Sequence, residues 1–106
     1  MADKAWKARE RSVAASFGSE RTPLSGGNGK QTRSDTLHPR LFIENKLRVK
    51  HSAVTLWDET ATMAKKEKKI PVVALCEKNR PGFFILVHSS NLQAVAAEYH
   101  GGNDAA

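Results

Sequence analysis

The sequence predicts a small α/β protein, in which a small mixed β-sheet is flanked by helices. In some segments apolar residues recur at intervals of three and four, which is typical of amphipathic helices. Other apolar runs lack this interval and predict strands buried in a sheet. The helices are expected at residues 3–17, 52–68 and 89–100, and the strands at residues 31–35, 41–48, 70–78 and 83–88. The predicted order is α-β-β-α-β-β-α.

The length of the chain predicts one small domain. A chain of 106 residues can bury a single core, and a second subunit would help to stabilise a protein of this size. We expect one domain over residues 1–100, followed by a flexible tail at residues 101–106. We also expect a homodimer.

The first predicted helix carries an acidic residue on its apolar side. Asp3 suits the N-cap position, and Trp6, Val13 and Phe17 belong to one apolar stripe. Glu10 lies on the same stripe, where a half-buried carboxylate needs a cationic partner or a metal ion.

The segment at residues 18–30 contains four glycines and a proline without apolar periodicity, so it predicts a long flexible loop. Long loops in small domains are often functional, and Arg21 and Lys30 suit contact with phosphate groups. The alternative is a plain connection between two elements.

The two strands expected at residues 31–35 and 41–48 are separated by a short turn, which predicts an antiparallel hairpin. Side chains alternate along a strand, so Glu44 and Lys46 are expected on one face, about 7 Å apart along the strand. His38 in the turn either contacts the substrate or has no role.

The second half of the chain predicts a helix, two strands and a last helix. Ser52 is expected at the start of a helix whose last turn is rich in lysine, which favourably opposes the helix dipole. The strands at residues 70–78 and 83–88 are expected to be buried on both faces. Cys76 lies in the first of these strands and is expected to be buried.

Charge predicts a polyanionic partner. The formal net charge is +6, and residues 1–50 hold 11 of the 17 basic residues but only five of the 11 acidic ones. The excess positive charge therefore lies in the first half, where a nucleic-acid backbone is expected to bind. The candidate DNA-binding residues are Arg9, Arg21, Ser25, Lys30, Arg33, Arg48 and Lys50.

The apolar runs are shorter than the roughly 20 residues of a membrane-spanning helix. The N-terminus is charged from its third residue and lacks the apolar block of a secretory signal. We therefore expect a cytoplasmic protein without a membrane partner. Zinc is not expected, because the four histidines have no metal-ligand spacing.

Three carboxylates belong to the elements that carry the positive charge. Pairing of the hairpin would bring Asp35 near Glu44, and packing of the first helix on the same face would bring Glu10 near both. Grouped carboxylates commonly share a hard divalent ion. Such an ion, with the amine of Lys46 beside it, is what metal-assisted hydrolysis of a phosphodiester requires. The alternative is structural: Glu44 and Lys46 form a solvated pair, and Glu10 lies at the margin of its helix.

The same residues carry a resemblance to a known family. Asp35, eight intervening residues and then Glu44-Asn45-Lys46 resemble the Asp…Glu-X-Lys signature of the PD-(D/E)XK nucleases. Ser34 stands where the name of the family has proline. The order of predicted elements is similar to the restriction-endonuclease-like core of that superfamily.

Within the superfamily, the chain most resembles the archaeal-type Holliday junction resolvases and small phage-encoded relatives. This resemblance depends on Glu10 on the first helix and on the loop sequence Leu24-Ser25-Gly26-Gly27. It covers residues 6–88. It implies that Ser25 belongs to a loop that approaches DNA, and a phage protein would act in the cytoplasm of its host.

The resemblance also implies roles for the site residues. It implies that Mg²⁺ is the cofactor and that Mn²⁺ can substitute for it. The ion would be held by Asp35, Glu44 and the backbone carbonyl of Asn45. The resemblance further implies that Glu10 assists metal or water binding and that Lys46 positions the attacking water.

Sequence and resemblance together predict a metal-dependent DNA endonuclease that acts on branched DNA, similar to a Holliday junction resolvase. Symmetric cutting of two strands would use the two sites of a two-fold dimer. One alternative is a nuclease of the same superfamily that acts on nicked, single-stranded or duplex DNA without preference for junctions. The other is a basic DNA-binding protein without catalytic activity.

Overall fold

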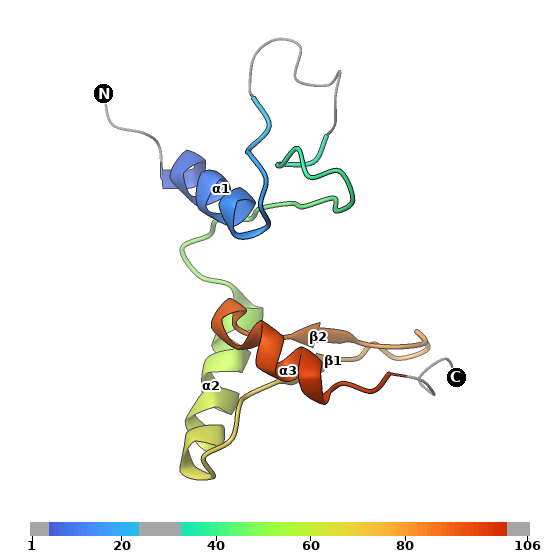
Figure 1. The fold of residues 1–106 in the computed structure, drawn as a ribbon. Helices are drawn as coiled ribbons and strands as arrows, with labels where there is room; N and C mark the ends of the chain where they lie inside the picture. Colours follow the sequence, from blue (N-terminus) through green and yellow to red (C-terminus); the bar gives the residue numbers. More distant parts are fainter. Residues whose placement is uncertain (1–4, 24–32, 102–106) are drawn as a thin grey trace. The chain divides into compact units, whose positions relative to one another are not determined.

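The structure is a computed structural model, and it describes residues 5–23 and 33–101. Backbone contacts divide the chain into two compact units, Met1–Val49 and Lys50–Ala106 (Figure 1). The elements are α1 (Ala5–Ser16), α2 (Ser52–Lys66), β1 (Val73–Leu75), β2 (Phe84–Leu86), the 3-10 helix η1 (Ser89–Asn91) and α3 (Leu92–Glu98).

Helices combined with a small antiparallel sheet agree with the coarse expectation of a small α/β protein. In the described ranges, no helix has both the length and the apolar character needed to cross a membrane. The single domain over residues 1–100 stays a prediction.

The end of α1 is determined by a glycine. Gly18 has a φ of 66°, a left-handed conformation that glycine adopts without steric cost. Its N–H donates to Ala15 O at 3.0 Å, and Ser19 N donates to Ala14 O at 2.8 Å. This pair of bonds is a Schellman motif, which ends the helix and turns the chain. Ala14 itself is completely buried.

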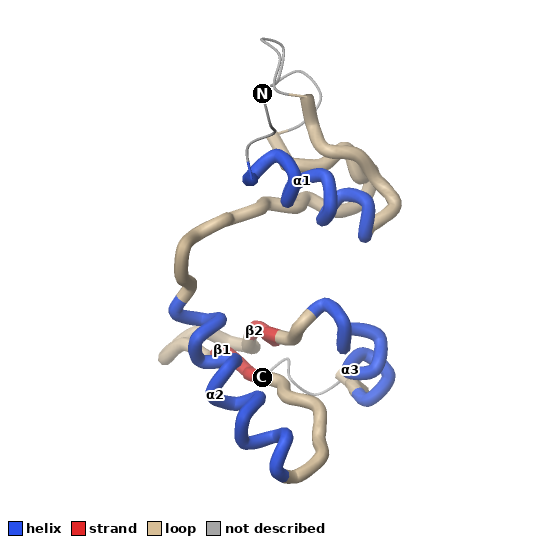
Figure 2. Tube along the Cα trace, turned by 90° about the vertical axis from the view of Figure 1, so that its left-hand side faces the viewer, coloured by secondary structure: helices blue, strands red, loops and turns tan. Residues whose placement is uncertain are grey.

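Residues 33–50 contain no strand, so the predicted strand 41–48 is wrong (Figure 2). Residues 33–35 of the other predicted strand are not a strand either, and residues 31 and 32 lie outside the described ranges. One backbone bond joins the two segments, from Asp35 N to Ile43 O at 2.7 Å. Side-chain groups make the neighbouring bonds in place of a β-ladder. The backbone of residue 36 instead forms an isolated antiparallel bridge with Arg21.

The buried centre of the first unit is unusually polar. Besides Ala14, the buried residues that the structure describes in this unit are Thr22, Ser34 and Thr36. The Thr22 hydroxyl donates to Ser34 O at 2.8 Å, and Thr22 N donates to Asp35 O at 3.0 Å. Buried polar groups are tolerated when they are hydrogen-bonded, and these bonds hold the chain around Asp35 in one conformation.

In the second unit, a short hairpin lies beside a helix. β1 and β2 pair antiparallel, with Val73 opposite Leu86 and Leu75 opposite Phe84, and β1 contacts α2. Val73 is the buried residue of this hairpin, whereas Phe84 is 56% exposed and Ile85 is 43% exposed.

The prediction that these strands are buried on both faces is therefore wrong. Each strand has only three residues, and the sheet has only two strands among the described residues. A sheet this small cannot enclose its own apolar side chains. Cys76 lies just beyond β1 and is exposed, which corrects the expectation that it is buried.

The helices of this unit agree with their predicted positions within a few residues. α2 begins at Ser52, as expected, and ends in a second Schellman motif, in which Lys69 N donates to Ala64 O at 3.0 Å. Here the left-handed residue is Lys68, with a φ of 57°. The helix predicted at residues 89–100 consists of η1 followed by α3.

Candidate functional site

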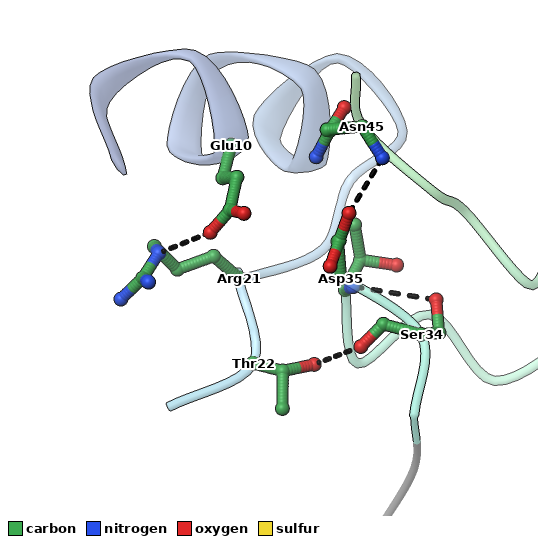
Figure 3. A network of polar contacts seen from close by, with 7 residues as sticks. Glu10, Arg21, Thr22, Ser34, Asp35 and Asn45 are labelled. Carbon is green, nitrogen blue, oxygen red and sulfur yellow. Dashed lines mark hydrogen bonds and ion pairs between the residues drawn. The ribbon is translucent and has the colours of Figure 1, made fainter. Parts of the chain in front are cut away.

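Asp35 is held at the centre of the polar network in the first unit (Figure 3). Its carboxylate oxygen Oδ2 accepts a hydrogen bond from Asn45 N at 2.5 Å, and its own N–H donates to Ile43 O. Bonds from a backbone N–H to a carboxylate are charge-assisted and strong. They fix residues 43–45 beside Asp35, so the two parts of the predicted signature lie together although no strand connects them.

The hydroxyl group of Ser34 also links these two segments. Ser34 Oγ donates to Ile43 O at 3.0 Å and accepts from Ile43 N at 2.8 Å, and Thr36 N donates to it at 3.3 Å. One hydroxyl therefore replaces the backbone pairing of a hairpin. The sequence signal was the run Ser34-Asp35-Thr36, in which hydroxyl residues flank the acid.

Glu44 and Lys46 form an ion pair at the surface. Lys46 Nζ lies 2.9 Å from Glu44 Oε2, and the exposed fraction is 57% for the Lys46 side chain and 47% for the Glu44 side chain. The two groups do lie together, as the solvated pair that the structural alternative describes, although residues 41–48 form no strand. An exposed pair of this kind contributes little to stability, because water screens it and ordering both side chains costs entropy. Both groups remain accessible to a substrate.

Glu10 has a different partner from the one expected. Arg21 Nε donates to Glu10 Oε1 at 3.0 Å, and only 17% of the Arg21 side chain and 15% of the Glu10 side chain are exposed. The Arg21 guanidinium also lies 5.7 Å from the ring centre of Trp6, close enough for a cation–π contact. Glu10 therefore neutralises a nearly buried arginine.

The expected grouping of three carboxylates is not formed. Across residues 5–23 and 33–101, no three Asp, Glu, His or Cys side chains come close enough to hold one ion. Asp35, Glu44 and the Asn45 carbonyl nevertheless supply hard oxygen donors on two segments that are tied together. Mg²⁺ is commonly bound through one or two carboxylates and keeps several waters. In their chemistry these oxygen donors are of the kind that Mg²⁺ prefers, whereas Glu10 is paired with Arg21.

A cavity of about 190 Å³ adjoins these residues, between α1 and residues 45–47. Its apolar lining comes from Trp6, Val13 and Leu47, and its polar lining from Arg9, Glu10, Asn45 and Lys46. Its lining therefore includes two cationic side chains, Arg9 and Lys46, of which Lys46 is paired with Glu44.

The predicted DNA-binding residues are distributed over the first 50 positions. Arg9, Arg33, Arg48 and Lys50 are exposed, as contact with a phosphate backbone requires. Ser25 and Lys30 lie outside the described residues.

His38 has a structural function in the turn. Its Nδ1 accepts hydrogen bonds from Arg40 N and Leu41 N, both at 3.0 Å. Its ring meets that of Phe17 edge to face, with 6.5 Å between the ring centres. These contacts fix the chain where it turns toward residue 43. The sequence suggested either contact with substrate or no role for His38, and it did not indicate this structural function.

Comparisons with known proteins give no match. The chain matches no protein-family model, and the searches of curated proteins and of solved structures return no similar protein.

Proposed function

We propose that this protein is a divalent-metal-dependent DNA endonuclease with branched DNA, such as a four-way junction, as its substrate. The observation that carries the proposal is the hydrogen bond from Asn45 N to Asp35 Oδ2. It holds Glu44-Asn45-Lys46 against the acid that precedes it in the predicted signature. In this proposal, the polar network of residues 34–36 and 43–45 takes the place of the first two strands of the nuclease core.

The proposed mechanism assigns one task to each group. Asp35, Glu44 and the carbonyl of Asn45 would hold Mg²⁺, which supplies polarisation of a phosphoryl oxygen and activation of a water. The ammonium group of Lys46, beside Glu44, orients the attacking water and balances the negative charge that develops on the phosphate. Arg9 and Arg48 hold the DNA backbone, which fixes the phosphodiester against the carboxylates.

The proposal includes a homodimer, because a four-way junction is resolved by two symmetric cuts. A two-fold axis places two copies of the site in the same symmetric relation as the two DNA strands that are cut. Mn²⁺ is expected to substitute for Mg²⁺, since both are octahedral ions that prefer oxygen ligands.

The test is cleavage of a labelled four-way junction and of a linear duplex with the same arm sequences, in Mg²⁺. Wild-type protein is compared with Glu44→Gln and with Glu59→Gln, which removes an exposed carboxylate from α2. We expect the junction to be cut by wild type and by Glu59→Gln, and cutting to fall at least 100-fold in Glu44→Gln. Equal cutting of junction and duplex would remove the preference for branched DNA, and cutting that persists in Glu44→Gln would overturn the site.

The pairing of Glu10 with Arg21 favours a second candidate, a DNA-binding protein without catalysis. With Glu10 engaged in this way, the first unit has fewer carboxylates for metal chemistry than the sequence predicts. In this case the protein would bind the junction with the same affinity in Mg²⁺ and in EDTA, and neither substrate would be cut.

A further inference from the structure

We propose that the cavity between α1 and residues 45–47 receives one unpaired pyrimidine base of the DNA substrate. This inference rests on the proposed function, because it takes DNA as the ligand. It adds that the protein recognises an unpaired nucleotide beside the phosphodiester, in addition to the charge of the backbone.

The size of the cavity indicates a single ring. Its volume is about 190 Å³, and a protein cavity of about 150 Å³ binds one benzene molecule. A six-membered ring with its exocyclic oxygens therefore fits, whereas a base pair does not. A base that enters must be free of its partner, as bases in single strands are and as a base becomes when it is extruded from a duplex.

The lining suits a base. Trp6, Val13 and Leu47 form an apolar wall for the flat faces of the ring. Trp6 is 37% exposed, so part of its indole is available for contact. Contacts between bases and aromatic side chains are a common means of binding single strands, and they tolerate many sequences.

A buried hydrogen-bond donor in the same wall lacks an acceptor. The side-chain Nδ2 of Asn45 is buried and has no hydrogen-bond partner among the described residues, although Asn45 N is bonded to Asp35. Figure 3 shows this amide beside α1, which forms the opposite wall of the cavity. A buried donor without an acceptor is costly, and rotation of the amide to meet a ligand that supplies an acceptor removes the cost. The ring carbonyls of a pyrimidine are such acceptors, and side-chain amides commonly bind base edges.

The charges at the cavity suit the adjoining phosphates. Arg9 and Lys46 contribute to its lining, and each can contact the backbone on one side of the bound nucleotide. Another cavity, of about 180 Å³, is lined by Val54, Trp57, Leu86, Val87, His88 and Ser89. Its lining contains neither a lysine nor an arginine, so it lacks this combination.

The test measures binding without metal, so that it is independent of cleavage. Trp57→Phe leaves Trp6 as the only tryptophan, and its fluorescence is followed during titration with oligo-dT and with an abasic oligonucleotide of the same length. We expect oligo-dT to quench Trp6 and to bind about tenfold more tightly than the abasic strand. Asn45→Ala should remove most of that difference, whereas Gln93→Ala, which removes an exposed amide from α3, should leave it unchanged.

Val13→Phe fills the cavity and should abolish the preference for oligo-dT. Thermal unfolding followed by circular dichroism shows whether this variant folds, and if it does not, Asn45→Ala carries the test. Equal affinity for oligo-dT and the abasic strand would overturn the proposal, as would an unchanged preference in Asn45→Ala. Preference for oligo-dT without any cutting in Mg²⁺ would support the base site and reject the nuclease. Cutting in Mg²⁺ without that preference would support the nuclease and reject the base site.

Discussion

Ser34→Ala should destabilise the first unit, because a single hydroxyl holds its two central segments together. The substitution removes the acceptor of Ile43 N at 2.8 Å and of Thr36 N at 3.3 Å, and the donor to Ile43 O at 3.0 Å. Ser34 is 3% exposed and Thr36 is 1% exposed, so water does not easily replace the lost group.

The magnitude follows from the unpaired groups that remain. Leaving a buried donor without an acceptor costs about 1–3 kcal/mol. The bond to Ile43 N is short and the one to Thr36 N is long, so we expect a loss of about 2 kcal/mol in the free energy of unfolding. That is a large fraction of the roughly 5 kcal/mol at the lower end of domain stability.

Ser34→Pro provides a sharper version of the same experiment. It introduces the residue that the name of the resembling family has at this position, but it removes the same hydroxyl. Proline also restricts the residue before it, Arg33, to extended conformations. We expect Ser34→Pro to destabilise the unit at least as much as Ser34→Ala.

The assay is urea unfolding in the Trp57→Phe background, where the fluorescence of Trp6 reports on the first unit alone. With a slope of about 1 kcal/mol/M for a small unit, a loss of 2 kcal/mol lowers the midpoint by about 2 M. Ser12→Ala, which removes an exposed hydroxyl from α1, is the matched control and should leave the midpoint nearly unchanged. A midpoint for Ser34→Ala within about 0.3 M of the parent protein would refute the reasoning.

Three further predictions concern stability and exposure. Lys68→Gly should stabilise the second unit by about 0.5–1 kcal/mol. The left-handed conformation costs a non-glycine residue about 1–2 kcal/mol, and the larger backbone entropy that glycine loses on folding offsets part of this gain. A lower melting temperature by circular dichroism would contradict this expectation. Gly18 already occupies the equivalent position after α1. Cys76 should react completely with a thiol reagent in the folded protein, and a requirement for denaturant would show that it is buried. A double-mutant cycle with Glu10→Gln and Arg21→Gln should give a coupling of about 1–2 kcal/mol, since the pair is mostly buried, and additive effects would contradict the ion pair.

The helices could be predicted from the sequence because their signal is local. Apolar residues at helical intervals predicted α1, and Ser52 was correctly expected at the start of α2. The sequence also placed Glu44 beside Lys46, but it did so through a strand that is not formed.

The predicted strands failed for two physical reasons. In the first unit the pairing of residues 34–36 with residues 43–45 is made largely by the side chains of Ser34 and Asp35, which no apolar pattern indicates. In the second unit the apolar runs do form strands, but only three residues of each pair, and the small sheet leaves Phe84 and Ile85 exposed. An apolar run indicates a tendency toward burial and does not show that a partner is present.

The Glu10–Arg21 pair could not be predicted because it depends on how a loop returns to a helix. The apolar stripe correctly indicated that Glu10 is mostly buried, and burial correctly required a partner. Sequence spacing could not decide between a metal ion and an arginine 11 positions away. The consequence is a smaller set of candidate metal ligands.

The most direct test of the central claim is single-turnover cleavage of a labelled four-way junction in Mg²⁺ by Asp35→Asn. The amide oxygen can still accept the hydrogen bond from Asn45 N, so the fold is preserved while the charge is lost. Asp58→Asn, which neutralises an exposed acid on α2, is the matched control. The account predicts that Asp35→Asn binds the junction but cuts it at least 100-fold more slowly than wild type and Asp58→Asn. Equal rates for all three proteins would contradict it.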